Sequence, residues 1–397
     1  ERYQLANGVS VLAARPHIRG EFFLMMADHV VDPAIYKALQ ATSPEGGLLL
    51  AVDRKLDTIY DMDDATKVVT GPGERIVKIG KMLPEFDAVD TGVFRCAPAL
   101  FDALQAELDA RGDTSLSDGV QALVAKDKAR VVDVGAAWWQ DVDTPGSKKH
   151  AEKLLFKSLT KAIDGPVSKH INRKISKSIT RLLVNTNVVP NHMTFVGLLV
   201  GLAASIATLM VTPSSLWLIP LGGVLFQLSS AIDGCDGEIA RLKFKHSDWG
   251  EWFDTVVDDV VNTLYFLSMG IAVTKLTGEA IWWQLGLTTF VVGWIVAGSL
   301  YKKLLESGNG THLAIQWDFQ NVEDPTWFQR FCDKFMFVAK RDFYAFALMI
   351  LSFIGVAAFK VTLALSVITV GLVGFQWAMT TARDAAGRRR RQVRVEG

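Results

Sequence analysis

The chain has 397 residues, of which half are hydrophobic, with 42 acidic and 42 basic side chains. This length allows two domains, and a formal net charge of zero gives no bulk attraction to nucleic acid, so we expect no nucleic-acid partner. Its three cysteines, Cys96, Cys235 and Cys332, are far apart. That spacing excludes a short zinc or disulfide motif and is typical of a reducing, cytosol-facing protein.

Residues 1–150 alternate short strand-like runs with helical ones, a pattern that predicts a soluble α/β domain. The apolar run 22–27 ends at Asp28. An acid at the carboxyl end of a buried strand lies where open α/β sheets form their ligand sites. A second candidate acid, Asp143, lies in the segment 139–145. The alternative is that both acids cap turns.

This domain resembles the later portion of a sugar nucleotidyltransferase, of the cytidylyltransferase type. The resemblance rests on three segments in family order, 90–94, 115–119 and 139–145. It implies that Asp28 and Asp143 hold Mg²⁺ at the nucleotide phosphates. Members of that family open with a glycine-rich loop whose backbone amides cradle the triphosphate, and no such loop occurs between Glu1 and Asp28. We therefore expect a partial domain, either truncated or degenerate.

Residues 151–190 predict a linker followed by a basic amphipathic helix. Apolar residues recur every four positions, with basic residues between them: Val167, Ile171, Ile175, Ile179 and Leu183, and Lys169, Arg173, Lys174, Lys177 and Arg181. Such a helix suits the membrane interface near anionic headgroups. A surface helix packed on the soluble domain is the alternative.

From residue 193 to residue 232 the chain carries no charged side chain. This stretch is about twice the length of one membrane span, and Pro213 interrupts its middle, so it predicts a transmembrane hairpin. Further spans are expected at 252–274, 280–301, 343–359 and 361–382. Residues 191–397 therefore predict an all-α domain with six transmembrane helices.

The basic residues near these spans favour one side of the membrane. That side carries Arg241, Lys243, Lys245, Lys302, Lys303, Lys340, Arg341 and the tail Arg388 to Arg391. The loops of the opposite side carry only Lys275 and Lys360. By the positive-inside rule, we expect a protein of the cytoplasmic membrane with both termini in the cytoplasm.

Four carboxylates lie where the second and third expected spans meet water on the cytoplasmic side. Asp233 and Asp236 are three residues apart and Asp254 and Asp258 are four apart, so each pair shares one face of a helix. Four anions at a membrane edge repel one another unless they are neutralised. Because hard oxygen ligands suit Mg²⁺, Mn²⁺ or Ca²⁺, one or two divalent cations are expected here. The alternative is a set of solvated acids that cap membrane helices.

The spacing of this region resembles the signature of the CDP-alcohol phosphotransferase family. The pattern D-x-x-D-G-x-x-A-R, eight residues and G-x-x-x-D-x-x-x-D is filled by Asp233, Asp236, Gly237, Ala240, Arg241, Gly250, Asp254 and Asp258. The resemblance implies that the four aspartates hold two Mg²⁺ or Mn²⁺ ions and that Asp258 is also the general base. It implies nucleotide binding at Gly237, Ala240, Arg241 and Gly250, and a homodimer. One departure is Asp259, where many relatives carry an arginine after the last acid.

The joined domains resemble bifunctional enzymes that combine inositol-1-phosphate cytidylyltransferase with di-myo-inositol-phosphate phosphate synthase. The linker 164–173 and the form of the motif at 233–238 share this resemblance. It implies transfer of a phospho-alcohol from CDP-inositol to a hydroxyl of inositol-1-phosphate, with release of CMP. Candidate contacts to the acceptor phosphate are Arg173, Lys243, Lys245, Lys302, Lys303, Lys340 and Arg341. Three alternatives remain: a phospholipid synthase that uses CDP-diacylglycerol, an ion transporter, and a scaffold without activity.

Overall fold

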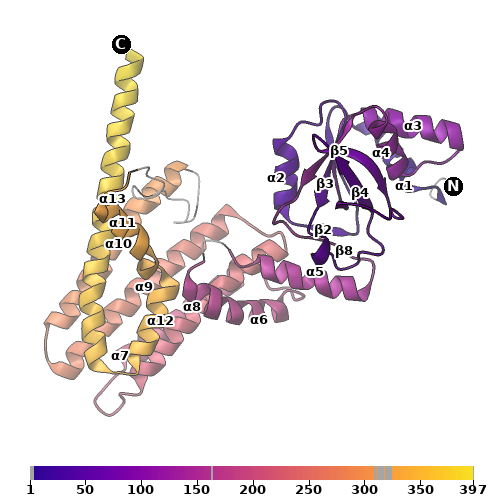
Figure 1. The fold of residues 1–397 in the computed structure, drawn as a ribbon. Helices are drawn as coiled ribbons and strands as arrows, with labels where there is room; N and C mark the ends of the chain where they lie inside the picture. Colours follow the sequence, from indigo (N-terminus) through magenta and orange to yellow (C-terminus); the bar gives the residue numbers. More distant parts are fainter. Residues whose placement is uncertain (1–3, 162–163, 308–309, 311–316, 318–323, 397) are drawn as a thin grey trace. The chain divides into compact units, whose positions relative to one another are not determined.

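The computed structural model describes residues 4–161, 164–307, 310, 317 and 324–396, apart from the side chains of 307, 336, 339 and 383–396. The basic tail Arg388 to Arg391 therefore lies outside the described side chains. The chain divides into two compact units, Glu1–Ser158 and Leu159–Gly397 (Figure 1). The domain boundary expected at residue 150 falls inside helix α5 (Pro145–Ser158), which belongs to the first unit.

The first unit is built around a six-stranded mixed sheet with the strand order β1-β6-β3-β7-β5-β4. Its strands are β1 (Phe22–Met25), β3 (Leu48–Asp53), β4 (Lys67–Gly71), β5 (Arg75–Gly80), β6 (Ala88–Cys96) and β7 (Ala129–Asp133). Strands β3 and β7 are parallel, and the other paired strands are antiparallel. A separate antiparallel pair joins β2 (His29–Val31) to β8 (Trp139–Asp141).

Helices cover both faces of this sheet (Figure 1). All six residues of β3 are buried, as a strand between two helical layers requires. Leu48 and Leu50 share a core with α3 (Ala99–Arg111) and α4 (Leu116–Val124). Leu49 packs on the opposite face with α2 (Pro33–Ala41). The short helix α1 (Asn7–Ala13) lies beside α3 and α4. The unit has the α/β architecture that the sequence predicts.

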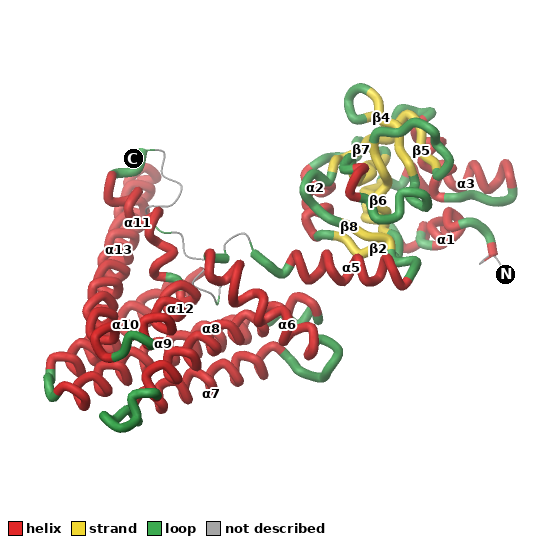
Figure 2. The backbone as a smooth tube through the Cα atoms, turned by 60° about the horizontal axis from the view of Figure 1, so that its bottom comes forward, coloured by secondary structure: helices red, strands yellow, loops and turns green. Residues whose placement is uncertain are grey.

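The secondary-structure elements described in the second unit are all helices, drawn red and joined by green loops in Figure 2. It begins with a π-helical turn (Ser168–Asn172) and α6 (Arg173–Leu183). The long helices are α7 (Pro190–Leu209), α8 (Leu218–Leu242), α9 (Asp248–Thr277), α10 (Ile281–Ser307) and α13 (Val356–Glu396). Between α10 and α13 lie α11 (Trp327–Phe335), a 3-10 turn (Met336–Ala339) and α12 (Arg341–Ser352).

Five described helices, α7, α8, α9, α10 and α13, are long and apolar enough to cross a membrane, whereas the sequence predicted six. The difference lies in the expected span 343–359. Helix α12 ends at Ser352, Gly355 adopts a φ of +93°, and α13 then begins at Val356. The 12 residues of α12 rise about 18 Å, which is short of a hydrocarbon layer of about 30 Å.

Helix α7 packs against both helices that carry the acidic motif, α8 and α9. Small residues make this possible: a side chain at Gly201 would meet Val261 of α9 at 2.4 Å, and one at Gly222 would meet Thr208 of α7 at 2.3 Å. Close approach at small residues is a usual way to pack helices in membranes. The packing of α7 fixes α8 and α9 relative to each other.

Candidate functional site

Three of the four motif aspartates converge between α8 and α9. Asp233, Asp254 and Asp258 each offer one carboxylate oxygen, and these oxygens lie within 4.8 Å of one another. The fourth, Asp236, accepts a hydrogen bond of 3.1 Å from Thr194 of α7 and another from the backbone N–H of Gly237. The spacing of the sequence therefore predicted the convergence of two helical pairs, and α7 contributes a partner that the motif does not include.

The chemistry of this cluster fits a divalent cation. One carboxylate oxygen of Asp254, Oδ1, is buried and has no hydrogen-bond partner among the described residues. A buried carboxylate oxygen without a partner is unfavourable unless a cation or a hydrogen-bond donor satisfies it. Carboxylate oxygens are the ligands that Mg²⁺ and Mn²⁺ prefer.

Arg341, the first residue of α12, is a cation in direct contact with the cluster. Its Nη1 donates a hydrogen bond of 3.0 Å to Asp233 and a second one to Asp258, and its Nη2 donates one of 3.0 Å to Ser229. The Arg341 side chain is only 12% exposed. One guanidinium against four aspartates leaves the cluster with excess negative charge, which favours additional cations.

The other four motif positions lie at the ends of α8 and α9. Gly237 faces Arg241, because a side chain at Gly237 would meet Arg241 Nη1 at 3.3 Å. Ala240 is buried at 8% exposure, and Arg241 Nη2 donates a hydrogen bond of 3.4 Å to the carbonyl oxygen of Leu159. Gly250 lies in the first turn of α9, where its N–H donates to Ser247, the N-cap residue.

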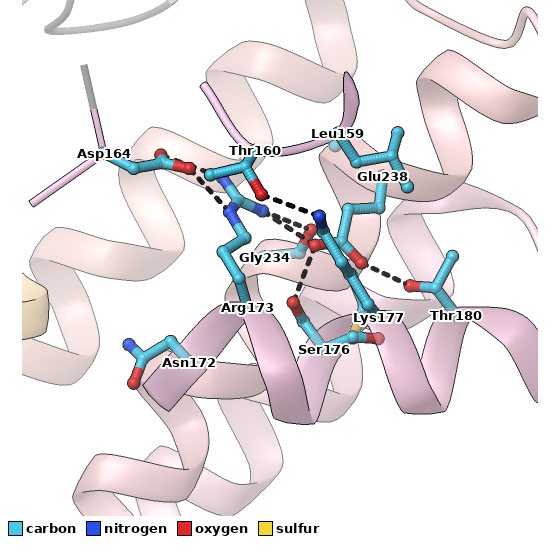
Figure 3. Close-up of polar contacts among 12 residues, drawn as sticks. Leu159, Thr160, Asp164, Asn172, Arg173, Ser176, Lys177, Thr180, Gly234 and Glu238 are labelled. Carbon is cyan, nitrogen blue, oxygen red and sulfur yellow. Dashed lines mark hydrogen bonds and ion pairs between the residues drawn. The ribbon is translucent and has the colours of Figure 1, made fainter. Parts of the chain in front are cut away.

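Glu238, between these positions, is fully buried and holds α6 against α8 (Figure 3). Its carboxylate accepts hydrogen bonds from Arg173 at 2.9 Å, from Ser176 at 2.6 Å and from Thr180 at 2.8 Å. The helical position of Glu238 after Gly237 permits either a nucleotide contact or a solvent-facing side chain, and its full burial excludes the second. A buried carboxylate needs several donors, and three residues of one helix supply them here.

Arg173 connects this buried acid with the linker and with the motif (Figure 3). Its guanidinium donates two hydrogen bonds to Asp164, at 2.8 and 3.1 Å, and one of 3.4 Å to the carbonyl oxygen of Gly234. Burial acts to raise the pKa of Asp164, but the bonds from Arg173 hold that pKa below its ordinary value. Burial likewise acts to lower the pKa of Arg173, and Asp164 and Glu238 together raise it. Both groups are therefore held in their charged forms.

The expected amphipathic helix thus differs in one respect from the structure. Arg173 bonds Asp164 and Glu238, and Lys177 donates a hydrogen bond of 2.7 Å to Thr160, so these two basic residues face protein groups. Ile179 and Leu183 pack against the α7–α8 core, whereas Ile175 is 37% exposed. Polar residues at 176 and 180 favour docking on Glu238, and periodicity alone does not reveal that partner.

The same linker has further bonds to α8 and α12. Asn172 accepts a hydrogen bond of 2.7 Å from Gln227 and donates to Ser230 of α8. The backbone N–H of Ser168 donates a hydrogen bond of 2.8 Å to Asp342, the neighbour of Arg341. These partners are distant in sequence, so the spacing of a motif does not predict them.

Asp259, which stands where many relatives carry an arginine, accepts a hydrogen bond from a residue of α10. The hydroxyl of Tyr301 donates a hydrogen bond of 2.5 Å to its carboxylate. Among the other expected acceptor contacts, Lys243 donates to the carbonyl oxygens of Thr186 and Val188, at 2.6 and 2.8 Å. Lys303 lies over the ring of Trp377 at 5.0 Å. Arg341 is the expected cation that directly contacts the aspartates.

In the first unit, each of the two expected metal ligands, Asp28 and Asp143, lies close to Asp141. The pairing of β2 with β8 places His29 opposite Asp141, so that Asp28, His29 and Asp141 form one group of possible ligands. Asp64, Asp141 and Asp143 form a second group. Burial raises the pKa of Asp141, His29 acts to lower it, and Asp143 and Asp28 raise it further. Sequence reasoning missed Asp141 and Asp64.

These groups line a cavity of about 460 Å³ in the first unit. Gly92, within the segment 90–94, has a φ of +74°, and a side chain there would meet the ring of His29 at 2.3 Å. Glycine at 92 therefore lets β6 approach His29 at the wall of the cavity.

Comparison with known proteins places the acidic motif in a family. Residues 187–316 match the family model described as CDP-alcohol phosphatidyltransferase. The matched residues are therefore similar to the CDP-alcohol phosphotransferase family. This phosphotransferase domain contains all eight motif positions and helices α7 to α10, and Arg341 and α13 lie beyond it in sequence.

Two curated relatives carry the name "Bifunctional IPC transferase and DIPP synthase". The protein from Thermococcus kodakarensis is 35% identical over 71% of this chain and 60% of its own length. The protein from Archaeoglobus fulgidus is 36% identical over 69% of this chain and 52% of its own length. Each match is longer than either unit, so it includes part of both units. The chain spans about half to three fifths of the length of these relatives.

A solved structure of the inositol-1-phosphate CTP transferase from T. maritima is also similar to this chain. It shares 30% identity over 38% of this chain and 62% of that chain, with a TM-score of 0.34.

Proposed function

We propose that the chain transfers a phospho-alcohol, phospho-inositol, from CDP-inositol to a hydroxyl of inositol-1-phosphate and releases CMP. The convergence of Asp233, Asp254 and Asp258 within the phosphotransferase domain carries this proposal. The relatives named as IPC transferase and DIPP synthase support the choice of inositol substrates.

The four aspartates Asp233, Asp236, Asp254 and Asp258 would hold Mg²⁺ or Mn²⁺, two ions in our proposal. A divalent cation bound there neutralises charge on the phosphate oxygens and orients the groups that react. The buried Asp254 oxygen without a partner supports this role. Thr194, through its bond to Asp236, fixes the side chain of that ligand.

Asp258 is the proposed general base. In the reaction, a hydroxyl oxygen of the acceptor forms a bond to the phosphorus that carries the donor's alcohol. The bond from this phosphorus to the oxygen of CMP breaks, and the hydroxyl proton passes to the carboxylate of Asp258. Arg341 contacts Asp258 and Asp233 together, so its positive charge lies beside both carboxylates.

The cytidine diphosphate would lie along α8 at Gly237 and Ala240, with Arg241 at a phosphate or at the base. Gly237 and Arg241 lie together on one face of α8. The Nε of Arg241 is buried without a hydrogen-bond partner among the described residues, which leaves a donor for such a ligand. Gly250 completes this region at the start of α9, where a side chain would meet Ser247 at 2.9 Å.

Of the basic residues on the expected cytoplasmic side, Arg341 would bind the acceptor phosphate. Arg341 is the candidate whose guanidinium already contacts the acidic cluster. The carboxylate of Asp259 is held by the hydroxyl of Tyr301 of α10.

We further propose six membrane crossings, with α12 as part of the fifth. Helix α12 begins with Arg341 at the aspartates and ends with Ser352, which lies against Gly223 near the start of α8. Helix α13 then begins where Lys360 forms an ion pair of 2.8 Å with Glu279, at the end of α9 opposite to the acids. The chain therefore crosses between these two levels. By the positive-inside rule, the aspartates and both termini would face the cytoplasm of the cell membrane. A homodimer is part of the proposal.

The first unit would be a cytidylyltransferase-like domain. Asp28 and Asp143 would hold a metal ion, and their shared neighbour Asp141 supports this assignment.

Phosphorus NMR of the reaction products tests the proposed reaction. The full chain is purified in detergent and incubated with CDP-inositol, inositol-1-phosphate and Mg²⁺, and the mixture is then extracted with organic solvent. We expect CMP and a water-soluble phosphodiester. No phosphodiester from these substrates, together with a lipid product when CDP-diacylglycerol is the donor, would show a phospholipid synthase instead.

A further inference from the structure

Helix α11 has three different faces along its nine residues. Phe328 and Cys332 form the first face, which packs on another helix. Trp327, Phe331 and Phe335, four residues apart, form the second, and they are exposed by 79%, 44% and 44%. Arg330, Asp333 and Lys334 form the third face and are exposed to solvent. We call the residues Trp327, Phe331 and Phe335 the aromatic stripe. It leaves three large apolar side chains of one short helix uncovered.

The first face sets the position of α11 along α13. The ring of Phe328 lies 6.1 Å from that of Phe375, and Gln376 donates a hydrogen bond of 2.9 Å to the sulfur of Cys332. The apolar part of α13 runs to Ala382, which is about 10 Å beyond Phe375 at 1.5 Å per residue. Helix α11 therefore lies near the end of the apolar segment of α13, beside α13 in both views (Figures 1 and 2).

A chain of aromatic rings continues from the stripe to α12. The rings of Phe331 and Phe335 are 4.7 Å apart, Phe335 and Phe337 are 6.5 Å apart, and Phe337 and Phe343 are 5.0 Å apart. Phe343 lies two residues after Arg341, which contacts the aspartates at the water edge. The stripe is thus at the level of the expected cytoplasmic boundary, and aromatic residues are enriched at such boundaries.

We propose that the aromatic stripe of α11 docks onto the lipid bilayer, with its rings at the boundary between headgroups and acyl chains. The charged face would remain in water, where Arg330 and Lys334 meet lipid phosphates. The stem of Lys334 lies near the ring of Phe335, with Nζ at 6.0 Å from its centroid, as a side chain that reaches from apolar surface to water would. The proposal rests on the proposed crossing of the bilayer by α10 and α13.

Lipid is the occupant that the structure favours. A helix with aromatic residues on one face and basic residues on another, attached to a membrane-crossing helix, is typical of the interface. The exposed apolar side chains of α13, which include Leu365 and Leu372, provide a lipid-facing surface on the helix that α11 packs against. Docking would also support the turn 336–339 that leads to Arg341.

Spin labels on the full chain in phosphatidylcholine–phosphatidylglycerol nanodiscs test this docking. In a background with the three cysteines replaced by alanine, labels are attached at Trp327→Cys and Phe331→Cys on the stripe. Arg330→Cys and Asp333→Cys on the charged face are the matched controls, and Leu365→Cys on α13 is the lipid reference. The ratio of collision with oxygen to collision with a water-soluble nickel complex is measured at each site. We expect this ratio to be severalfold higher at 327 and 331 than at 330 and 333.

The outcomes separate the possible occupants of the stripe. If the nickel complex reaches positions 327 and 331 as readily as position 333, water covers the stripe. If positions 327 and 331 are shielded from both oxygen and the nickel complex, another part of the protein or a second copy covers the stripe. Either result overturns the proposal. If the label at 365 still gives a lipid-like collision ratio, the α13 span assignment holds and only the docking proposal fails. Failure of the docking is therefore distinguishable from failure of the span assignment. If the cysteine-free chain does not fold, the quenching of tryptophan fluorescence by brominated lipid is measured in the native sequence instead. We expect Trp327→Leu to reduce this quenching.

Discussion

Arg173 of α6 donates a hydrogen bond of 2.9 Å to Glu238 of α8, whose carboxylate is fully buried one position after Gly237 of the acidic motif. The pair lies outside the eight positions that define the family signature. It nevertheless fixes the helix that precedes the membrane region to the helix that carries two candidate metal ligands.

Replacing Arg173 with alanine is expected to destabilise the helical unit. The change removes the guanidinium that pairs with Glu238 and leaves the hydroxyl donors Ser176 and Thr180, and breaking a buried ion pair typically costs about 3–5 kcal/mol. Unfolding by sodium dodecyl sulfate in mixed micelles measures the loss. Lys174→Ala, at an exposed position of the same helix, is the matched control and should lose less than about 0.5 kcal/mol. Adding Glu238→Gln to Arg173→Ala should restore part of the stability, and the absence of any restoration would contradict this origin.

Replacing Arg341 with alanine is expected to strengthen the binding of Mn²⁺. The guanidinium lies 3.0 Å from Asp233 and also contacts Asp258, so its positive charge opposes a divalent cation at the same carboxylates. Titration followed by electron paramagnetic resonance of free Mn²⁺ measures the affinity. Arg330→Ala, on the exposed face of α11, serves as the control for loss of one positive charge. Weaker Mn²⁺ binding in Arg341→Ala would show that Arg341 mainly organises the ligands.

The first unit should become more stable as pH falls from 7 to 5. Burial raises the pKa of Asp90 to about 6, the N–H of Gly92 acts to lower it, and His29 also lowers it. An acid with a raised pKa in the folded state binds more protons there, so its contribution favours folding at low pH and is lost as pH rises through about 6. The contribution of this group should change by about 1 kcal/mol between pH 5 and 7. Hydrogen exchange of β6 amides, corrected for intrinsic rates, measures it, and Asp90→Asn should remove the difference.

Six crossings predict that residues 354 and 244 lie on opposite sides of the membrane. Ile354 is in the break between α12 and α13, and Phe244 is in the loop between α8 and α9; both are highly exposed. Cysteines at these positions, in the cysteine-free background, are reacted with an impermeant maleimide in intact cells. We expect labelling at 354 alone, and labelling at 244 only after lysis. Equal protection of both positions in intact cells would contradict a crossing between α10 and α13.

The sequence predicted the features that local spacing determines. Hydropathy indicated α7 to α10, and separations of three and four residues placed each pair of motif aspartates on one face of a helix. The division of the expected span 343–359 was not predicted, because hydropathy continues through Gly355 although its backbone conformation ends a helix. The positive φ of Gly355 lies in the break that separates α12 from α13.

Contacts between distant segments could not be predicted in the same way. Glu238 finds its donors on α6 and Asp259 finds Tyr301 on α10, and no spacing within one helix indicates such partners. In the first unit, Asp141 lies close to Asp28 because β2 pairs with β8. The periodicity of α6 suggested an apolar face for lipid, whereas its buried polar residues Ser176 and Thr180 face Glu238.

The central claim is that Asp258 and its neighbouring aspartates form a phosphotransfer site. The most direct test measures CMP release by the full chain from CDP-inositol and inositol-1-phosphate with Mg²⁺, in parallel for the native sequence, Asp258→Asn and Asp248→Asn. Asp248 lies in the first turn of the same helix, outside the cluster, so it is a matched control. We expect release to fall at least about a hundredfold in Asp258→Asn, given the usual contribution of a general base, and to remain near the native rate in Asp248→Asn. Native rates in Asp258→Asn would contradict the account.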